Sequence, residues 1–302
     1  MLEIQNLHKN YGTRSVLCGL DLSIKSGEIY GLLGPNGSGK TTTINLICNL
    51  LKADAGSITI NQKRSGESDK SILGIVPQEN LLYKSLTCQE NLSFYADIYG
   101  LIGRRKNQQI KQALEWVNLL DRANHRVENL SGGLQRRLNI AISLIHRPKL
   151  LILDEPTTGL DIESRYEVWL LLQKLNQQGM TILLTTHLLD EAERLCNRIG
   201  IIKSGRIIAQ GSLEELRMLV PAKEIVFIKV KEEAEAIELI KELGWTYRYY
   251  RRELAILLPQ ALELREILNY FDGLSVDSVS RQFVSLENIY LEVINQSNSF
   301  HK

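Results

Sequence analysis

Residues 34–42 place three glycines, a lysine and two threonines at the spacing of a phosphate-binding loop. We expect the glycines to take positive φ and let successive N–H groups approach phosphate oxygens. Lys40 adds a positive charge for a triphosphate, and the Thr41 hydroxyl is a ligand for Mg²⁺. The candidate phosphate-binding residues are Gly34, Pro35, Asn36, Gly37, Ser38, Gly39, Lys40, Thr41 and Thr42.

The elements on either side of this loop must position it. The apolar run Ile29 to Leu33 predicts a buried strand, and Thr41 to Leu51, with Ile44, Ile47, Leu50 and Leu51 on one stripe, predicts an amphipathic helix. Strand, glycine-rich loop and helix follow in the order that triphosphate binding requires. The alternative, a glycine-rich turn with a solvated lysine, does not explain that order.

Two adjacent carboxylates end a second apolar run. Leu150 to Leu153 predicts a buried strand, and Asp154 and Glu155 follow it directly. Asp154 is placed to reach the Mg²⁺ that Thr41 binds, and Glu155 is placed to accept a proton from the water that attacks the γ-phosphate. The same residues could instead cap a turn after a core strand, but beside a phosphate-binding loop the catalytic interpretation is favoured.

A second anion-binding end is predicted at Ser131, Gly132 and Gly133, which precede a helical pattern. One phosphate loop already serves one nucleotide. We therefore expect this end to face a nucleotide on another subunit, although an ordinary serine cap followed by flexible glycines would have the same sequence.

The chain divides into two predicted domains. Residues 1–219 alternate strands and helices, which indicates an α/β core with a mostly parallel sheet. Short strands at 2–6, 16–24 and 57–61 predict an antiparallel flap, and residues 81–146 predict a helical subdomain. Residues 220–302 read as strand, helix, strand, strand, helix, strand and a final helix, which is the order of the ferredoxin-like split motif.

Composition narrows the function classes. Net charge is +1, with 36 basic and 35 acidic residues, which gives no global attraction to nucleic acid. No apolar run approaches the roughly 18 residues that span a bilayer, and residues 1–9 lack the apolar region of a signal peptide. The four cysteines are scattered without a CxxC pair, as expected of a protein in a reducing compartment.

Six motifs occur together in the order and spacing of the ATP-binding subunits of ABC transporters, and the chain resembles that family over about residues 1–215. They are GPNGSGKTT, the Val76-Pro77-Gln78 segment, LSGGL, LLILDEP, Gly159-Leu160-Asp161 and the Thr185-Thr186-His187 segment. The resemblance implies a P-loop NTPase fold of the ABC ATPase type, with ATP and Mg²⁺ as the bound nucleotide and metal.

The resemblance also implies roles for single residues. Tyr11 would stack on adenine, and Gln78 would link Mg²⁺ and the attacking water to the membrane-facing helices. Asp154 would bind Mg²⁺, and Glu155 would be the general base. Asp161 would cross a dimer interface, and His187 would contact the γ-phosphate. The catalytic set is then Glu155, His187, Gln78 and Lys40, and the metal set is Thr41, Gln78 and Asp154.

One position departs from the family's pattern. The signature usually reads LSGGQ, whereas position 134 is Leu and Gln135 follows it. One residue along a helix rotates a side chain by about 100°, so Gln135 is not expected to replace the missing amide. A signature of this kind followed by Arg136 to Ala141, and the closing segment 285–291, resemble the exporter branch with ABC-2 type permeases, which includes multidrug and antibiotic exporters.

We therefore expect a transport ATPase that binds two ATP molecules between two copies of itself and acts on separate membrane permease subunits at the cytoplasmic face of the membrane. No nucleic acid partner is expected. A soluble ABC protein acting on nucleic acid or ribosomes is the alternative, but such proteins resemble tandem cassettes or carry long coiled coils. A regulatory ATP binder is a third reading, which the set of Asp154, Glu155 and His187 disfavours.

Overall fold

The structure is a computed structural model that describes residues 1–66, 70–250 and 252–299. Its contacts divide the chain into two compact units, Met1–Gln210 and Gly211–Lys302. The sequence changes character near residue 220, whereas the units separate at 210, because the short helix α7 (Leu213–Arg217) packs within the second unit against α10 (Leu286–Ser299). None of the helices in the described ranges has the length and apolarity that crossing a bilayer requires.

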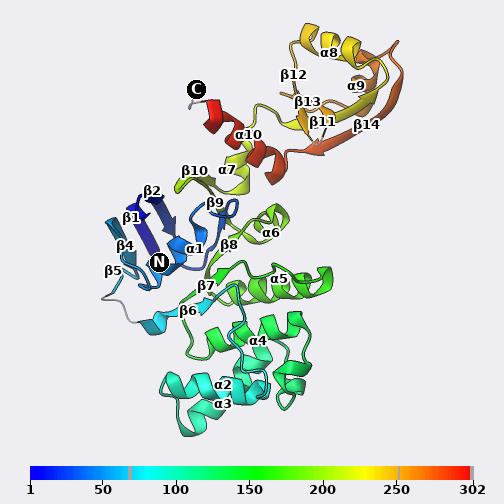
Figure 1. The fold of residues 1–302 in the computed structure, drawn as a ribbon. Helices are drawn as coiled ribbons and strands as arrows, with labels where there is room; N and C mark the ends of the chain where they lie inside the picture. The colour runs from blue at the N-terminus through cyan, green and yellow to red at the C-terminus, as the bar shows by residue number, and fades with distance from the viewer. Residues whose placement is uncertain (67–69, 251, 300–302) are drawn as a thin grey trace. The chain divides into compact units, whose positions relative to one another are not determined.

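The first unit contains a mostly parallel sheet with the strand order β10-β9-β3-β8-β7-β6 (Figure 1). Four neighbouring pairs in this order are parallel: β9 with β3, β3 with β8, β8 with β7, and β7 with β6. The central strands are apolar on both faces, as expected for a sheet covered on both sides. The strands are β3 (Ile29–Leu33), β6 (Leu73–Val76), β7 (Leu150–Asp154), β8 (Thr181–Thr186), β9 (Arg198–Lys203) and β10 (Arg206–Gly211).

Two hydrophobic cores cover the faces of this sheet. On one face, Leu150, Ile152 and Leu183 pack with α1 and an antiparallel sheet of order β2-β1-β4-β5. On the other face, Leu151 and Leu153 belong to a core that contains residues of helices α2, α3, α4 and α5. The antiparallel strands are β1 (Leu2–Tyr11), β2 (Arg14–Ile24), β4 (Ala55–Ile60) and β5 (Lys63–Arg64). The helices are α1 (Lys40–Ile47), α2 (Cys88–Ile98), α3 (Gly103–Trp116), α4 (Gly132–Leu144), α5 (Ile162–Gln177) and α6 (Leu189–Leu195).

Helix α1 is shorter than the apolar stripe predicts. It ends at Ile47, and Asn49 takes a left-handed conformation with φ of 55°. Asparagine adopts this conformation readily and ends helices there. Leu50 consequently leaves the stripe and is 69% exposed, so its assignment to the buried face was wrong.

The second unit follows the predicted order of elements after α7. Its sheet has the order β12-β13-β11-β14 with antiparallel neighbours, which is the order that results when two βαβ units interleave. Its core includes Val226, Ile228, Ile240, Ile256 and Phe271. The elements are β11 (Glu224–Val230), α8 (Glu233–Glu242), β12 (Thr246–Tyr250), β13 (Glu253–Leu258), α9 (Leu264–Tyr270) and β14 (Val276–Phe283).

Candidate active site

Four segments that the sequence singled out follow four neighbouring strands. The phosphate loop follows β3, His187 follows β8, Glu155 follows β7, and Pro77 and Gln78 follow β6. These strands are adjacent in the order β3-β8-β7-β6 and run parallel. Their carboxyl ends therefore meet at one edge of the sheet, where ligands of open α/β sheets bind.

The phosphate loop is held close to its neighbours by glycine. Gly37 and Gly39 have φ of 79° and 112°, as predicted. Gly34 was predicted to share this conformation, and that was wrong, because it is absent from the positive-φ residues. Gly34 is required for a different reason: a Cβ there would lie 2.5 Å from the carbonyl oxygen of Ile202.

Several polar groups of the loop suit a bound phosphate. The hydroxyl of Ser38 is buried without a hydrogen-bond partner among the described residues, so a phosphate oxygen would satisfy it. Helix α1 begins after Gly39, and no side chain caps its first turn. The N–H groups of that turn and the helix dipole favour an anion at this end. The loop therefore fits a nucleotide phosphate.

Lys40 lies against the same loop. Its Nζ donates to the carbonyl oxygens of Gly34 (2.8 Å) and Pro35 (3.2 Å), and it lies 3.4 Å from Glu155 Oε1. Only 5% of the Lys40 side chain is exposed. Because the ammonium lies between the loop carbonyls and the carboxylate, it is fixed where phosphate charge would be placed.

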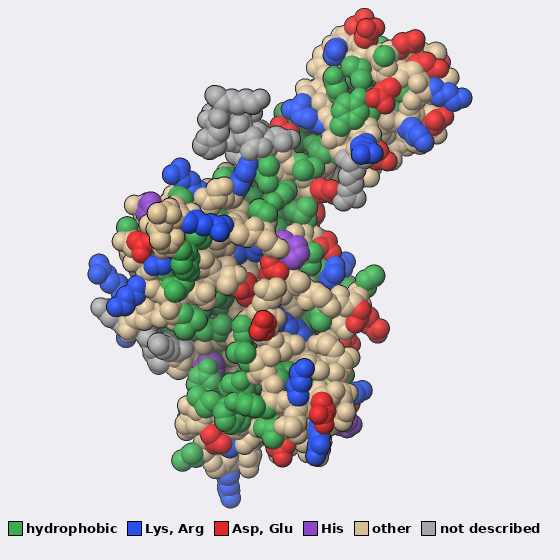
Figure 2. Space-filling model, in the orientation of Figure 1, with side chains coloured by type: hydrophobic (Ala, Val, Ile, Leu, Met, Phe, Trp, Pro, Cys, Tyr) green, Lys and Arg blue, Asp and Glu red, His purple; other side chains and the backbone are tan. Residues whose placement is uncertain are grey.

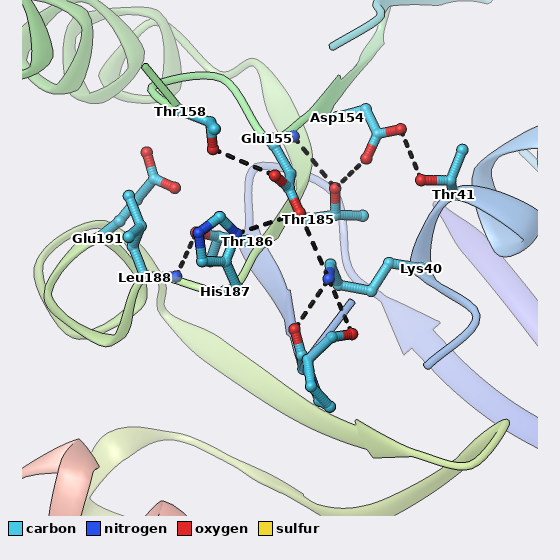
Figure 3. Close-up of polar contacts among 12 residues, drawn as sticks. Lys40, Thr41, Asp154, Glu155, Thr158, Thr185, Thr186, His187, Leu188 and Glu191 are labelled. Atoms are coloured by element: carbon cyan, nitrogen blue, oxygen red, sulfur yellow. Dashed lines mark hydrogen bonds and ion pairs between the residues drawn. The ribbon is translucent and has the colours of Figure 1, made fainter. Parts of the chain in front are cut away.

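Asp154 and Thr41 form a pair of oxygen ligands. Thr41 Oγ1 donates to Asp154 Oδ2 at 2.9 Å, and Thr185 Oγ1 donates to Asp154 Oδ1 (Figure 3). Hydroxyl and carboxylate oxygens suit Mg²⁺, which usually keeps several waters and also takes phosphate oxygens. Within the described ranges, no group of three or more His, Cys, Asp and Glu side chains could hold a metal ion. A magnesium site here would therefore be completed by phosphate and water.

Glu155 is held between two basic side chains. His187 Nδ1 lies 3.2 Å from its Oε1, and Thr158 Oγ1 donates to its Oε2 at 3.2 Å (Figure 3). Burial raises the pKa of the Glu155 carboxyl, but the hydrogen bond and charge of His187, the charge of Lys40 and the Thr158 hydroxyl outweigh it, and the pKa is lowered. The carboxylate is therefore ionised at neutral pH and able to accept a proton.

The backbone of Glu155 is strained. Its φ is 46°, in the left-handed region that non-glycine residues occupy rarely. The N–H of Glu155 donates both to the carbonyl oxygen (3.1 Å) and to the hydroxyl (3.2 Å) of Thr185. Such a conformation costs on the order of 1 to 3 kcal/mol and persists where its surroundings hold it, typically at functional sites.

A buried arginine connects Gln78 to this turn. Arg136 is 3% exposed, and its guanidinium donates to the carbonyl oxygens of Pro77, Pro156 (2.8 Å) and Asp154 (3.0 Å). Burial lowers the pKa of Arg136 to about 10, so it remains charged at neutral pH. The segment that follows β6 and the turn that follows β7 are thus held by one side chain of α4. The sequence placed Arg136 in the segment after the signature but gave no role for its side chain, because its partners are backbone atoms.

One cavity of about 470 Å³ collects many of the predicted site residues. It is lined by Tyr11, Arg14, Val16, Asn36, Gly37, Gly39, Lys40, Thr41, Thr42, Gln78 and Glu155. Tyr11, at the end of β1, is 48% exposed, so its ring is accessible to a ligand. Arg14 and Val16 also line the cavity and were not predicted, since neither lies in a motif.

Ser131 and Asp161, which do not line this cavity, cap helices. Ser131 caps α4, its Oγ accepting from the N–H of Leu134 at 3.4 Å. Asp161 caps α5, accepting from the N–H (2.8 Å) and Oγ (2.9 Å) of Ser164. Ser131 and Asp161 are nevertheless exposed, so the caps leave both residues accessible to another molecule.

The side chains of Leu134 and Gln135 have separate structural contacts. Leu134 is partly buried against the hydrophobic core of the helical region. Gln135 Nε2 donates to the carbonyl oxygens of Leu130 (3.0 Å) and Val127 (3.3 Å) in its own chain. The amide of Gln135 is thereby engaged in holding the turn before α4, and it does not take the place of a glutamine at 134.

Known proteins resemble most of this chain in sequence. The model of the ABC transporter family matches residues 17–158. The linearmycin resistance ATP-binding protein LnrL of Bacillus subtilis (strain 168) is 44% identical over 219 residues, which are 72% of this chain and 70% of that protein. Nod factor export ATP-binding protein I of Burkholderia orbicola (strain AU 1054) is 41% identical over 214 residues, 70% of each chain.

Solved structures agree with this likeness. The ATP-binding subunit of an ABC transporter superposes with a TM-score of 0.64 at 31% identity, covering 72% of this chain and 92% of the other. A dimeric ATP-binding cassette in a post-hydrolysis state, bound to ADP and Pi, superposes with a TM-score of 0.62 at 30% identity, covering 70% and 99%. The chain therefore belongs to the ABC transporter family, as an ATP-binding subunit that binds ATP with Mg²⁺ and hydrolyses it.

Proposed function

We propose that this chain powers export through separate membrane permease subunits, as a dimer at the cytoplasmic face of the membrane. The direction of transport is supported by the relatives named for linearmycin resistance and Nod factor export. The observation that carries the catalytic part is the position of Glu155, 3.2 Å from His187 Nδ1 and 3.4 Å from Lys40 Nζ, directly after Asp154.

Each residue then has a distinct role. Lys40 and the loop N–H groups bind the phosphates, and Tyr11 stacks on the adenine. Glu155 accepts a proton from the attacking water, and His187 contacts the γ-phosphate and holds the carboxylate in place. Thr41, Asp154 and Gln78 hold Mg²⁺, which neutralises phosphate charge when it is bound.

The remaining residues of the site act across a dimer. Ser131 and Gly132 are exposed and do not line the cavity of their own chain, which supports a place against the nucleotide of a second copy. Gly133 follows them directly in sequence and lies against Ser164, whose N–H donates to Asp161 at 2.8 Å, so we assign Gly133 and Asp161 to the same face. One of the similar solved cassettes is itself dimeric.

The permease would contact the helical region. Leu81, Tyr83, Phe94 and Ile98 are 57%, 47%, 40% and 63% exposed, and Figure 2 shows hydrophobic side chains gathered over α2 and α3. Tyr83 and Phe94 meet edge to face, with ring centroids 4.8 Å apart. An apolar surface of this kind favours a protein partner. Arg136 connects this apolar surface to the active site, because its side chain bonds both to the segment before Leu81 and to the turn after β7.

For residues 220–302 we propose a dimer-stabilising or regulatory role. Truncation after Val220 tests it: weaker dimerisation or altered turnover is expected, and a truncated protein with unchanged dimerisation, turnover and transport would contradict it.

Glu155→Gln tests the central proposal. Removing the general base should lower ATP turnover by about a hundredfold or more while phosphate binding continues. The variant should then accumulate as an ATP-bound dimer in size-exclusion chromatography with light scattering. Glu238→Gln, an exposed change on α8, is the control and should behave like the wild type. A Glu155→Gln protein that stays monomeric with ATP and hydrolyses it at the wild-type rate would overturn the proposal.

A further inference from the structure

A carboxylate outside the nucleotide cavity is buried completely. Glu191, on α6, is 0% exposed, and its Oε1 accepts from Thr157 Oγ1 (2.7 Å) and Trp169 Nε1 (3.1 Å). Its Oε2 has no hydrogen-bond partner in the described part of the chain. Burying such a group costs free energy unless hydrogen bonds compensate it fully, so the position calls for an explanation.

The partners of Glu191 come from the two elements that flank the site. Thr157 lies two residues after Glu155 and next to Thr158, whose hydroxyl donates to Glu155 Oε2. Trp169 lies on α5, which begins directly after Asp161. Glu191 itself lies on α6, which begins two residues after His187. One carboxylate therefore connects the turn after β7, the helix after Asp161 and the helix after His187.

These contacts close a ring around the reacting groups. On one side, Glu155 Oε1 lies 3.2 Å from His187 Nδ1, and on the other, Thr157 bonds to Glu191 (Figure 3 shows Glu155, His187 and Glu191). The N–H of Leu188 donates to Thr186 Oγ1 at 2.9 Å, which fixes the start of α6 relative to β8. Two connections between the same two segments set their spacing, whereas a single contact would act as a hinge.

The spacing matters because Glu155 has a strained backbone with φ of 46°. A strained residue relaxes unless neighbouring contacts hold it. A displacement of about 1 Å in a catalytic group lowers a rate by roughly a hundredfold.

We propose that Glu191 is a positioning residue for ATP hydrolysis, which holds the turn carrying Glu155 at a fixed distance from His187. This rests on the proposed roles of Glu155 and His187. Glu191 touches neither the nucleotide cavity nor the reacting atoms, so it acts through Thr157 and α6.

The test compares four single variants of the full chain by kcat, KM for ATP and Tm. Glu191→Leu removes the acceptor, and Glu191→Gln keeps a carbonyl oxygen at its place. Thr157→Val removes the donor without changing shape, and Thr157→Ser keeps it. We expect kcat to fall about tenfold or more in Glu191→Leu and Thr157→Val, with KM within about twofold of wild type. Glu191→Gln and Thr157→Ser should retain most of the wild-type kcat.

The double variant Glu191→Leu with Thr157→Val gives a further check. If the two residues act through one bond, kcat of the double variant should be little lower than kcat of either single variant. Additive losses would overturn the proposal. A wild-type kcat in Glu191→Leu would overturn it too. So would a Glu191→Gln protein that shares with Glu191→Leu a lower kcat, a changed KM and a lower Tm. If Glu191→Leu does not fold, the comparison of Thr157→Val with Thr157→Ser tests the proposal. Equal kcat values in these two variants would contradict it.

Glu155→Gln, assayed beside these variants, separates the two proposals. Wild-type turnover in Glu155→Gln would overturn the role of Glu155 on which the inference rests. Loss of turnover in Glu155→Gln together with wild-type turnover in Glu191→Leu would overturn only the role of Glu191.

Discussion

His187 and Glu155 meet because their strands are paired in register. Asp154 of β7 lies opposite Thr185 of β8, so Glu155 and His187 each leave the same edge of the sheet within two residues of that pair. The N–H of Glu155 donates to Thr185, which keeps the turn close to β8. The contact of 3.2 Å between His187 Nδ1 and Glu155 Oε1 thus follows from strand register.

Thr185→Val should weaken magnesium binding. Valine has the shape of threonine but leaves Asp154 Oδ1 without its donor, while Thr41 still bonds to Oδ2. Outer groups that orient a metal ligand change metal affinity by about 10- to 100-fold. The Mg²⁺ concentration for half-maximal ATPase activity should therefore rise about tenfold, which a magnesium titration at saturating ATP measures.

Thr181→Val is the matched control for that change. Thr181 lies at the other end of β8, where its Oγ1 accepts from the N–H of Gly27 at 3.0 Å. Its loss should lower the free energy of unfolding by about 1 kcal/mol and leave the magnesium requirement unchanged. Equal magnesium requirements in the two variants would contradict the role of Thr185.

Gly133→Ala should destabilise the cassette where Gly132→Ala does not. A Cβ at Gly133 would lie 2.5 Å from the Cβ of Ser164 on α5, so the starts of α4 and α5 would have to separate. At Gly132 the nearest atom, Leu160 Cδ2, is 3.9 Å away. We expect urea unfolding to show a loss of about 1 to 3 kcal/mol for Gly133→Ala and a change within about 0.5 kcal/mol for Gly132→Ala. Similar values for both would argue against this packing constraint.

The strands that carry the site could be predicted because each is a short apolar run that ends in a polar motif. Ile29 to Leu33 and Leu150 to Leu153 are such runs, and both strands form there. Helix ends were harder to predict: Leu50 continues the apolar stripe, but the left-handed backbone at Asn49 ends α1 before it.

The supporting roles of three further residues gave no signal in the sequence. Arg136 bonds to carbonyl oxygens, Thr185 bonds to Asp154 across two strands, and Glu191 bonds to α5 and to the turn after β7. Thr185 and Arg136 lie in segments that the sequence singled out, but each of these three roles depends on elements far apart in the chain, which no local spacing pattern shows. Local pattern indicates which residues react, whereas tertiary packing determines which residues hold them.

The stability of Glu191→Gln relative to wild type should rise with pH. Burial raises the pKa of the Glu191 carboxyl, with Asp190 adding to the effect, and this outweighs the opposing effect of the Thr186 and Thr157 hydroxyls and the Trp169 N–H. Above the ordinary carboxyl pKa of 4.5 the unfolded chain releases this proton first, so the wild-type free energy of unfolding falls until the folded pKa is passed. Glutamine does not titrate.

Urea unfolding of both proteins between pH 4 and pH 8 measures that difference. Arg136 and Cys196, which also interact with Glu191 electrostatically, are present in both proteins, so much of their own titration cancels. If the free energy of unfolding of Glu191→Gln minus that of the wild type stays constant or falls as the pH rises, the pKa of Glu191 is not raised.

Leu134→Gln should strengthen ATP-dependent dimerisation. Position 134 lies on the first turn of α4, beside Ser131 and Gly132, which we place against the nucleotide of a second copy. One added hydrogen bond is worth about 0.5 to 1.5 kcal/mol, and a dimer with two such sites gains two of them, so the dimer of Leu134→Gln in the Glu155→Gln background should form at a roughly five- to hundredfold lower concentration. Gln135→Leu is the control: it loses the bonds to Leu130 and Val127 and should lower stability without tightening the dimer. Unchanged or weaker dimerisation in Leu134→Gln, with folding intact, would place this turn away from the partner's nucleotide.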